Sequence, residues 1–166
     1  MRKERCSNCG AEARVVRGAH HFKEIALKNV TLMGVKLIQC PTCGNEDVVI
    51  PRVNEVMRVL AMAVVNKPYR LAGHEVRFLR KFLGMTGEEF ARLLHVEKTT
   101  LSKWENDDPP IGQQSDLLVR SVALALGEGL QGRQAEVVRQ FERITKQPRH
   151  ALELQVDPQT MSYRYA

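Results

Sequence analysis

This 166-residue chain has four cysteines in two pairs. Their spacing suits the binding of a metal ion. The pairs are Cys6-Ser7-Asn8-Cys9 and Cys40-Pro41-Thr42-Cys43, and a glycine follows each. Two residues between cysteines allow both thiolates to bind one ion, and the following glycine suits a positive φ or a close backbone approach. Two such knuckles predict a closed tetrahedral structural zinc site with Zn–S bonds of about 2.3 Å and the ligands Cys6, Cys9, Cys40 and Cys43.

The alternatives are a redox-active CxxC pair or four free thiols, which a lone CxxC would leave open. His20 and His21 lie between the knuckles, but four cysteines suffice as ligands, so we interpret both as surface histidines. No HExxH motif and no other spacing of a catalytic zinc site occurs, so we expect no enzyme. The segment between the knuckles predicts short, exposed strands, with Gly34 at a bulge or bend, that need the metal to fold.

A second candidate functional segment is the stretch HVEKTTLSKWEN, from His95 to Asn106. Apolar residues recur in it at helical spacing, at Val96, Leu101 and Trp104. This pattern predicts either an ordinary amphipathic surface helix or a helix whose polar face contacts a partner. The polar residues in question are Lys98, Thr99, Thr100, Ser102, Lys103 and Asn106.

The elements around this stretch predict three short helices, over residues 74–83, 87–94 and 98–105. Thr86 with Glu89 three residues later is a capping-box signal for the second helix. The connection before the third helix is short, which is typical of a helix-turn-helix.

The sequence resembles the Cro/CI-type (Xre) helix-turn-helix family at residues 85–94, Val96 and residues 101–106. By this resemblance, Lys98, Thr99 and Lys103 would read base edges in the major groove, where lysine can donate to guanine. The positions implied to contact phosphate or flank the reading residues are Thr100, Ser102 and Asn106. The chain departs from the family at Gly87, where glutamine is common, and at His95, where glycine is usual. The resemblance thus places His95 in the turn, where a non-glycine residue is tolerable because histidine is enriched among residues with positive φ.

The two regions together resemble the MqsA-like antitoxin family, which joins a YgiT-type zinc domain to an Xre helix-turn-helix. The resemblance covers about residues 6–126 and includes the pattern of residues 29–35. It implies an N-terminal domain that can bind a toxin protein. It also implies a homodimeric C-terminal domain that binds a palindromic double-stranded DNA operator and represses its own operon. The chain departs by extending beyond the expected end, over residues 133–166.

The predicted fold class is α+β, with a small N-terminal β zinc ribbon followed by an all-α helix-turn-helix domain. We expect a helix over residues 55–65, another over residues 116–126 capped by Ser115, a last helix over residues 133–146, and a C-terminal tail that is strand or disordered. Leu117, Leu118, Val122, Leu124 and Leu126 would either supply a dimer interface or complete the core. The predicted divisions are a zinc-binding β domain at 1–50, a helical linker at 51–70, the Xre-type domain at 71–130, and a C-terminal helix and tail at 131–166.

Charge and composition limit the classes of partner. The net charge is +6 and the pI about 9.4, which permits an anionic partner. Residues 1–70 hold twelve basic and six acidic side chains, whereas residues 71–110 hold six basic and seven acidic ones. DNA binding by residues 71–110 would therefore depend on the positions of individual side chains and not on net charge. No apolar run approaches the roughly 20 residues of a membrane span, and no signal-like segment begins the chain. We therefore expect a cytoplasmic protein with reduced cysteines.

Three functions compete at this point. The first is a dimeric, sequence-specific transcriptional regulator, either antitoxin-like or free-standing. The second is a zinc-dependent protein-interaction module that does not bind DNA. The third, a zinc enzyme or thiol oxidoreductase, is the least favoured.

Overall fold

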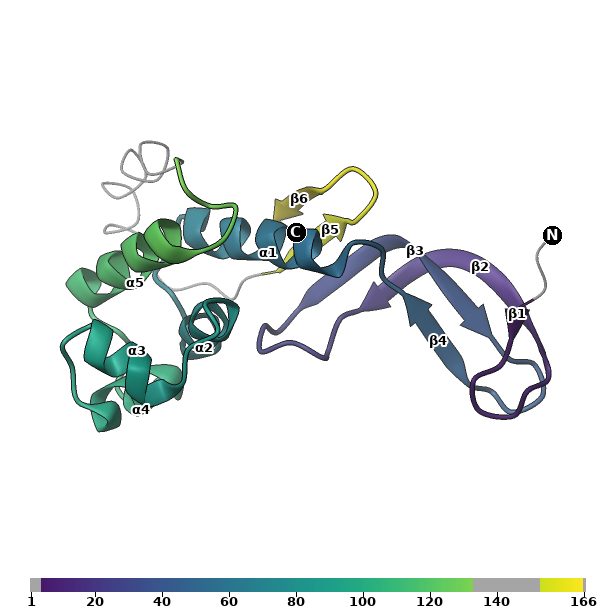
Figure 1. The fold of residues 1–166 in the computed structure, drawn as a ribbon, viewed down its shortest axis with the longest axis horizontal. Helices are drawn as coiled ribbons and strands as arrows, with labels where there is room; N and C mark the ends of the chain where they lie inside the picture. Colours follow the sequence, from purple (N-terminus) through teal and green to yellow (C-terminus); the bar gives the residue numbers. More distant parts are fainter. Residues whose placement is uncertain (1–3, 133–152, 166) are drawn as a thin grey trace.

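The computed structural model describes residues 4–132 and 153–165 and is elongated, with a β arm at one end and a helical domain at the other (Figure 1). It confirms the α+β class. The arm precedes five helices, and a C-terminal hairpin returns to the sheet. Among the described helices, none has the length and apolar composition that crossing a membrane requires.

The arm is built on two long antiparallel strands, β2 (Glu12–His21) and β3 (Val30–Gln39). β1 (Glu4–Arg5) pairs with the start of β2, and β4 (Glu46–Val49) pairs with the end of β3. Gly34 has a φ of 67°, and the pairing of β2 with β3 shifts register between Gly18 and His20. The predicted irregularity at Gly34 is therefore present inside one continuous strand.

The expectation that these strands are too short and too exposed to hold a fold was wrong. β2 and β3 have 10 residues each, and in β3 the side chains of Val30, Leu32 and Val35 are almost fully buried. They share one hydrophobic core with the helices and with the C-terminal hairpin. The local sequence pattern could not show this core, because its other members lie far along the chain.

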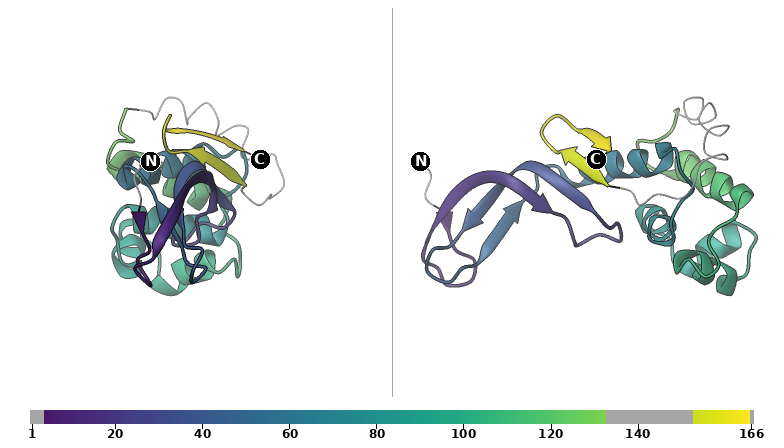
Figure 2. Two further views of the ribbon diagram at one scale, coloured as in Figure 1. Left: turned by 90° about the vertical axis from the view of Figure 1, so that its right-hand side faces the viewer. Right: turned by 180° about the vertical axis from the view of Figure 1, so that it is seen from behind.

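The C-terminal hairpin consists of β5 (Leu154–Asp157) and β6 (Ser162–Tyr165). β5 runs parallel to the start of β3, with its Leu154 opposite Val30, and both Leu154 and Val156 are buried. The Tyr165 hydroxyl donates to the carbonyl of Ala63 at 2.8 Å, so the hairpin also holds the first helix (Figure 2). This tail is strand, one of the two expected states. The helix expected over residues 133–146 lies outside the described residues.

Helix α1 (Val53–Asn66) joins the sheet to the helical domain. Its second half, from Leu60 to Asn66, is buried on every side, which is the pattern of a helix enclosed by other elements. The helix exceeds the predicted range of 55–65 by two residues at its start and one at its end.

A buried ionic network fixes the connection after α1. Arg120 is fully buried, and its guanidinium contacts the Asp116 carboxylate at 2.9 Å. The same guanidinium donates to the backbone carbonyls of Val65, Lys67 and Tyr69. A second buried pair joins Lys67 to Glu75 at 2.7 Å. Since buried charges need partners, these contacts hold the turn between α1 and the next helix in one conformation.

Helix α5 (Gln113–Leu126) begins three residues earlier than predicted. Its N-cap is Gly112 in an extended conformation, so Ser115 lies inside the first turn and is not the cap. Along this helix Leu124 is buried, whereas Leu118 and Leu126 are 44% and 50% exposed. The apolar residues expected to serve either a core or an interface are therefore divided between an inner and an outer face.

Candidate metal centre and nucleic-acid interface

The two cysteine knuckles have the same backbone geometry. In the first, the N–H of Gly10 donates to the Cys6 carbonyl at 3.0 Å, and in the second Gly44 donates to Cys40 at the same distance. Gly10 and Gly44 have φ values of 72° and 73°, and a Cβ added at either would meet nothing within 4 Å. Each glycine is therefore required by its backbone conformation and not by lack of space.

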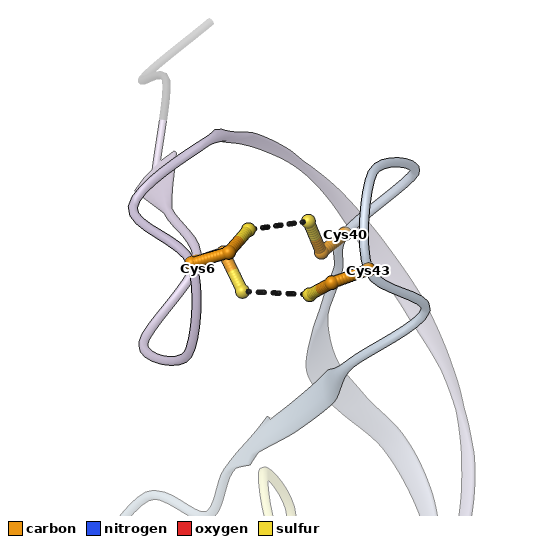
Figure 3. A group of neighbouring side chains, drawn as sticks. Cys6, Cys40 and Cys43 are labelled. Atoms are coloured by element: carbon orange, nitrogen blue, oxygen red, sulfur yellow. Dashed lines mark hydrogen bonds between the residues drawn. The ribbon is translucent and has the colours of Figure 1, made fainter.

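The four predicted cysteines come together at the tip of the arm. Their sulfur atoms all lie within 4.8 Å of one another, with Cys6–Cys43 at 3.6 Å and Cys9–Cys40 at 3.5 Å (Figure 3). A tetrahedral zinc site with Zn–S bonds of 2.3 Å would have S–S separations of about 3.8 Å. The donor set and its spacing therefore fit a structural zinc ion. Neither His20 nor His21 belongs to this cluster.

The protein environment favours thiolate in each knuckle. The backbone N–H of Cys43 is the largest cause that lowers the pKa of the Cys40 thiol, to about 6, against the opposing effect of burial. The backbone N–H of Cys9 likewise lowers the pKa of Cys6. At Cys9 the backbone N–H of Ala11 lowers the pKa, but hydrogen bonds with the neighbouring thiols outweigh it and raise the pKa to about 12. The hydrogen bonds within each knuckle therefore favour the thiolate form, which metal ions bind, at Cys6 and Cys40.

Polar side chains also join the two knuckles, and sequence reasoning missed them. The Ser7 hydroxyl donates to the Asp47 carboxylate at 2.7 Å, and this bond is the main cause that lowers the pKa of Asp47. The Asn45 amide donates to both Ser7 and Asp47. These residues are ordinary turn formers, so their types alone did not indicate a bridge between knuckles.

Little apolar surface is buried at this tip. Its hydrophobic cluster consists of Cys6, Ala13 and Cys40, with Ala11 and Ile38 packed against it. Such a small core contributes little to folding, so a bound ion would supply much of the local stability.

The helical domain carries the predicted triplet of helices, α2 (Gly73–Phe82), α3 (Gly87–Leu93) and α4 (Lys98–Glu105). The Thr86 hydroxyl accepts from the backbone N–H of Glu89 at 3.2 Å, and the Glu89 carboxylate accepts from the N–H of Thr86 at 2.8 Å. The predicted capping box is thus confirmed. The backbone hydrogen bond from Thr86 also lowers the pKa of Glu89.

The turn between α3 and α4 has the predicted conformation. His95 has a φ of 54°, and the N–H of Val96 returns to the carbonyl of Ala91 at 3.0 Å. Leu101 is buried in the hydrophobic core, and Trp104 is half-buried against the same core. These contacts fix the direction of α4 relative to the rest of the domain.

The polar residues of α4 that sequence reasoning selected lie mostly on its outer face. Their i, i+1, i+4, i+5 spacing places four of them side by side on a helix. Lys98, Thr99, Ser102 and Lys103 are exposed, and Thr100 is half-buried. Asn106 is exposed, but its amide donates to the Ser102 carbonyl at 2.8 Å and accepts from Arg77 at 2.9 Å. Asn106 therefore closes the end of α4.

Ion pairs and hydrogen bonds that the sequence did not predict join the end of α4 to α2. Glu105 pairs with Arg80 at 2.6 Å and with Arg77 at 3.1 Å. The N–H of Gly73 donates to the Asp107 carboxylate at 2.9 Å, and a Cβ at Gly73 would lie 2.6 Å from the Glu105 backbone. Helix α2 begins directly against the end of α4, and only glycine permits that approach. The local sequence gave no signal for this contact.

Comparison with known proteins found no matching family model and no significant match among curated proteins or solved structures. The geometry therefore defines the chain as an N-terminal β region that holds a candidate four-cysteine metal site, followed by a five-helix domain.

Proposed function

We propose that this chain is a zinc-stabilised, sequence-specific DNA-binding transcriptional regulator of the cytoplasm. The observation that carries the proposal is the outward stripe of Lys98, Thr99, Ser102 and Lys103 on a helix fixed by a capped helix-turn-helix. Lysine and threonine side chains on such a helix can donate to guanine, and threonine can pack on a thymine methyl group. The short polar side chains beside them suit phosphate contacts that set the register.

The charge distribution indicates that DNA affinity would come from individual side chains at defined positions and not from a generally basic surface. The segment 71–110 has six basic and seven acidic side chains, so its net charge cannot supply the affinity. Residues 1–70 carry the excess positive charge, with twelve basic and six acidic side chains, and this charge would steer the molecule toward an anionic partner.

We propose that the regulator is a homodimer on a palindromic operator. Leu118, Val122 and Leu126 follow one another at intervals of four residues on α5, and Leu118 and Leu126 are about half exposed. Two copies joined through this stripe would form a two-fold symmetric dimer, and its two reading helices would have to match half-sites about 34 Å apart.

The likeness to MqsA-like antitoxins further suggests an autorepressor whose arm binds a toxin. In the described part of the chain, no strand pairs with the outer edge of β2 from Arg14 to His21. Val15 and Val16 on this strand are 42% and 39% exposed. A free strand edge with exposed apolar side chains is suited to pairing with a strand of a partner protein. A free-standing regulator without a toxin would keep the DNA-binding half of the proposal.

The same strand edge favours a second candidate function, a protein-interaction module that does not bind DNA. Salt dependence separates the two, because several phosphate contacts make affinity fall steeply with salt concentration. We propose a binding protein and not an enzyme, since four sulfur ligands leave no open position on a zinc ion for catalysis.

The direct test is a mobility-shift titration with DNA that the full-length protein selects from a random pool. Lys103→Ala should weaken specific binding by about 1–3 kcal/mol while zinc content and thermal unfolding stay unchanged. Lys81→Ala is the matched control, because Lys81 is also exposed but lies at the end of α2. Equal affinity of the Lys103→Ala variant and the wild type would overturn the assignment of α4 as the reading helix.

A further inference from the structure

A cleft opens where two strands meet the same edge of β3 without meeting each other. β4 pairs with Lys36–Gln39, and β5 pairs with Val30–Leu32, which leaves residues 33–35 between them. The cavity at this break has a volume of about 410 Å³, within the range of small-molecule sites. Its apolar walls come from Val35, Val49, Pro51 and Pro158.

All the charged residues that line this cleft are basic: Arg17, Lys36 and Arg52. Arg17 and Lys36 stand directly opposite each other on β2 and β3, and like charges in that position destabilise a strand pair. Lys36 is paired with Glu4 at 2.6 Å, and Arg52 with Glu55 at 3.1 Å. Arg17 has no acidic partner in the part of the chain that the structure describes. One positive charge at the cleft is therefore uncompensated.

The polar side chains of the cleft are held by contacts between segments far apart in the sequence. Arg17 donates to the Gly34 carbonyl at 3.2 Å, and the Gln159 amide donates to the same oxygen at 3.1 Å. Arg52 donates in turn to the Gln159 carbonyl at 3.1 Å. The φ of Arg52 is 47°, a strained value for a non-glycine residue, and such strain is often found at binding sites. The arm, the start of α1 and the C-terminal hairpin thus converge at the cleft.

We propose that this cleft binds a small aliphatic carboxylate. The carboxylate lies against the Arg17 guanidinium, and its hydrocarbon part packs on the valine and proline walls. Charge-assisted hydrogen bonds to arginine are strong, and the anion would supply the counter-charge that Arg17 lacks among the described residues. A free carboxylic acid and the C-terminal carboxylate of a polypeptide present the same chemistry. The proposal does not depend on DNA binding.

The test is calorimetric titration of the full-length, zinc-loaded protein with four probes. These are 3-methylbutanoate, its neutral amide, the acetylated tripeptide Ala-Leu-Leu with a free carboxylate, and the same peptide amidated. We expect each carboxylate to bind about tenfold or more tightly than its amide. Tighter binding of the peptide than of 3-methylbutanoate identifies a chain terminus as the natural ligand, and the reverse order identifies a free acid.

Two variants locate the site. Arg17→Gln should weaken carboxylate binding by about tenfold or more, because it removes the uncompensated charge. Arg14→Gln is the matched control, since Arg14 is exposed on the same strand but does not line the cleft. Far-UV circular dichroism and zinc content confirm that both variants are folded. Absence of saturable binding by either carboxylate, or equal affinity of the Arg17→Gln variant and the wild type, would overturn the proposal.

Discussion

The tip of the arm and the helical domain are held together by different interactions. Among the described residues of the tip, the buried hydrophobic cluster consists of Cys6, Ala13 and Cys40, and four sulfur atoms lie within 4.8 Å of one another. The helices share a continuous core in which Leu60, Phe78 and Phe90 are at most 1% exposed. One region is organised by a candidate metal site and the other by packed hydrocarbon and buried ion pairs.

The comparison shows that the interactions that stabilise β3 change along its length. The start of β3, at Val30 and Leu32, belongs to the large core, whereas its end leads directly into the Cys40 knuckle. β5 strengthens the first part by pairing with it, and β4 lies beside the second. The arm therefore does not depend uniformly on metal.

Removal of the metal should produce the largest effect, and it should be confined to the tip. Zinc contributes about 10–16 kcal/mol in isolated zinc-finger peptides, whereas the described residues of the tip add a small hydrophobic cluster and the exposed hydrogen bonds among Ser7, Asn45 and Asp47. Chelation of the full-length protein should abolish hydrogen-exchange protection around Cys6 and Cys40 while protection at Val30–Leu32 and in α1 persists. Loss of protection throughout β3 and the helices would show that the two regions are not separately stabilised.

The buried ionic network is the next test, because it acts only in the helical domain. Arg120→Ala leaves the buried Asp116 carboxylate without its cation and removes three hydrogen bonds to backbone carbonyls, so the free energy of unfolding should fall by about 3–5 kcal/mol. Urea denaturation measures this loss. The double variant Arg120→Met with Asp116→Leu should be less destabilised, since it leaves no buried charge without its partner and shares with Arg120→Ala only the loss of hydrogen bonds to the backbone. Equal destabilisation of both variants would contradict the electrostatic explanation.

The close contact between α2 and α4 should give a smaller effect. A methyl group at Gly73 would lie 2.6 Å from the Glu105 backbone, so Gly73→Ala should cost about 1–3 kcal/mol. Gly87→Ala is the matched control, because a Cβ there meets nothing within 4 Å and alanine favours the helix. Thermal unfolding of the two variants should therefore shift in opposite directions. A neutral Gly73→Ala would show that the two helices can separate without cost.

The capping box of α3 should give the smallest effect. Thr86→Ala should reduce the free energy of unfolding by about 1 kcal/mol, and exposed Thr99→Ala should leave it unchanged. Because the pKa of Glu89 is lowered in the folded state, the stabilisation by its carboxylate is present at neutral pH. It is lost on acidification, as the pH falls from the ordinary pKa of a glutamate through the lowered one. In unfolding curves recorded across that acidic range both proteins should lose stability, and their difference should shrink only in part, because alanine keeps the backbone N–H that donates to Glu89 and the bond from the Glu89 N–H to the Thr86 hydroxyl does not depend on charge.

Local patterns in the sequence were sufficient to find the helices around the candidate nucleic-acid interface. The predicted ranges 74–83, 87–94 and 98–105 differ from the observed helices by at most one residue at each end. Apolar periodicity and the Thr86 cap act within a few residues, so they are readable without a partner. The spacing within each cysteine pair is also a local pattern. It correctly predicted that the four sulfur atoms lie close together.

Contacts between segments far apart in the chain could not be predicted from local sequence patterns. Arg120 and Asp116 are four residues apart, which in the sequence is the pattern of an exposed helical ion pair, yet both are buried. Leu154 alternates with polar neighbours, but nothing in that alternation indicates pairing with Val30. The opposition of Arg17 and Lys36 likewise depends on strand register, which the intervening loop sets and the composition does not.

The most direct test of the functional proposal is selection of bound DNA from a random pool by the full-length, zinc-loaded protein. We predict enrichment of one palindromic sequence whose half-sites are centred about 10–10.5 base pairs apart, as expected for two copies of α4 in successive major grooves. Binding to this sequence should fall steeply as salt concentration rises. Failure to enrich any sequence, or enrichment of the same sequence with equal affinity by Lys103→Ala, would contradict the proposal that α4 reads DNA.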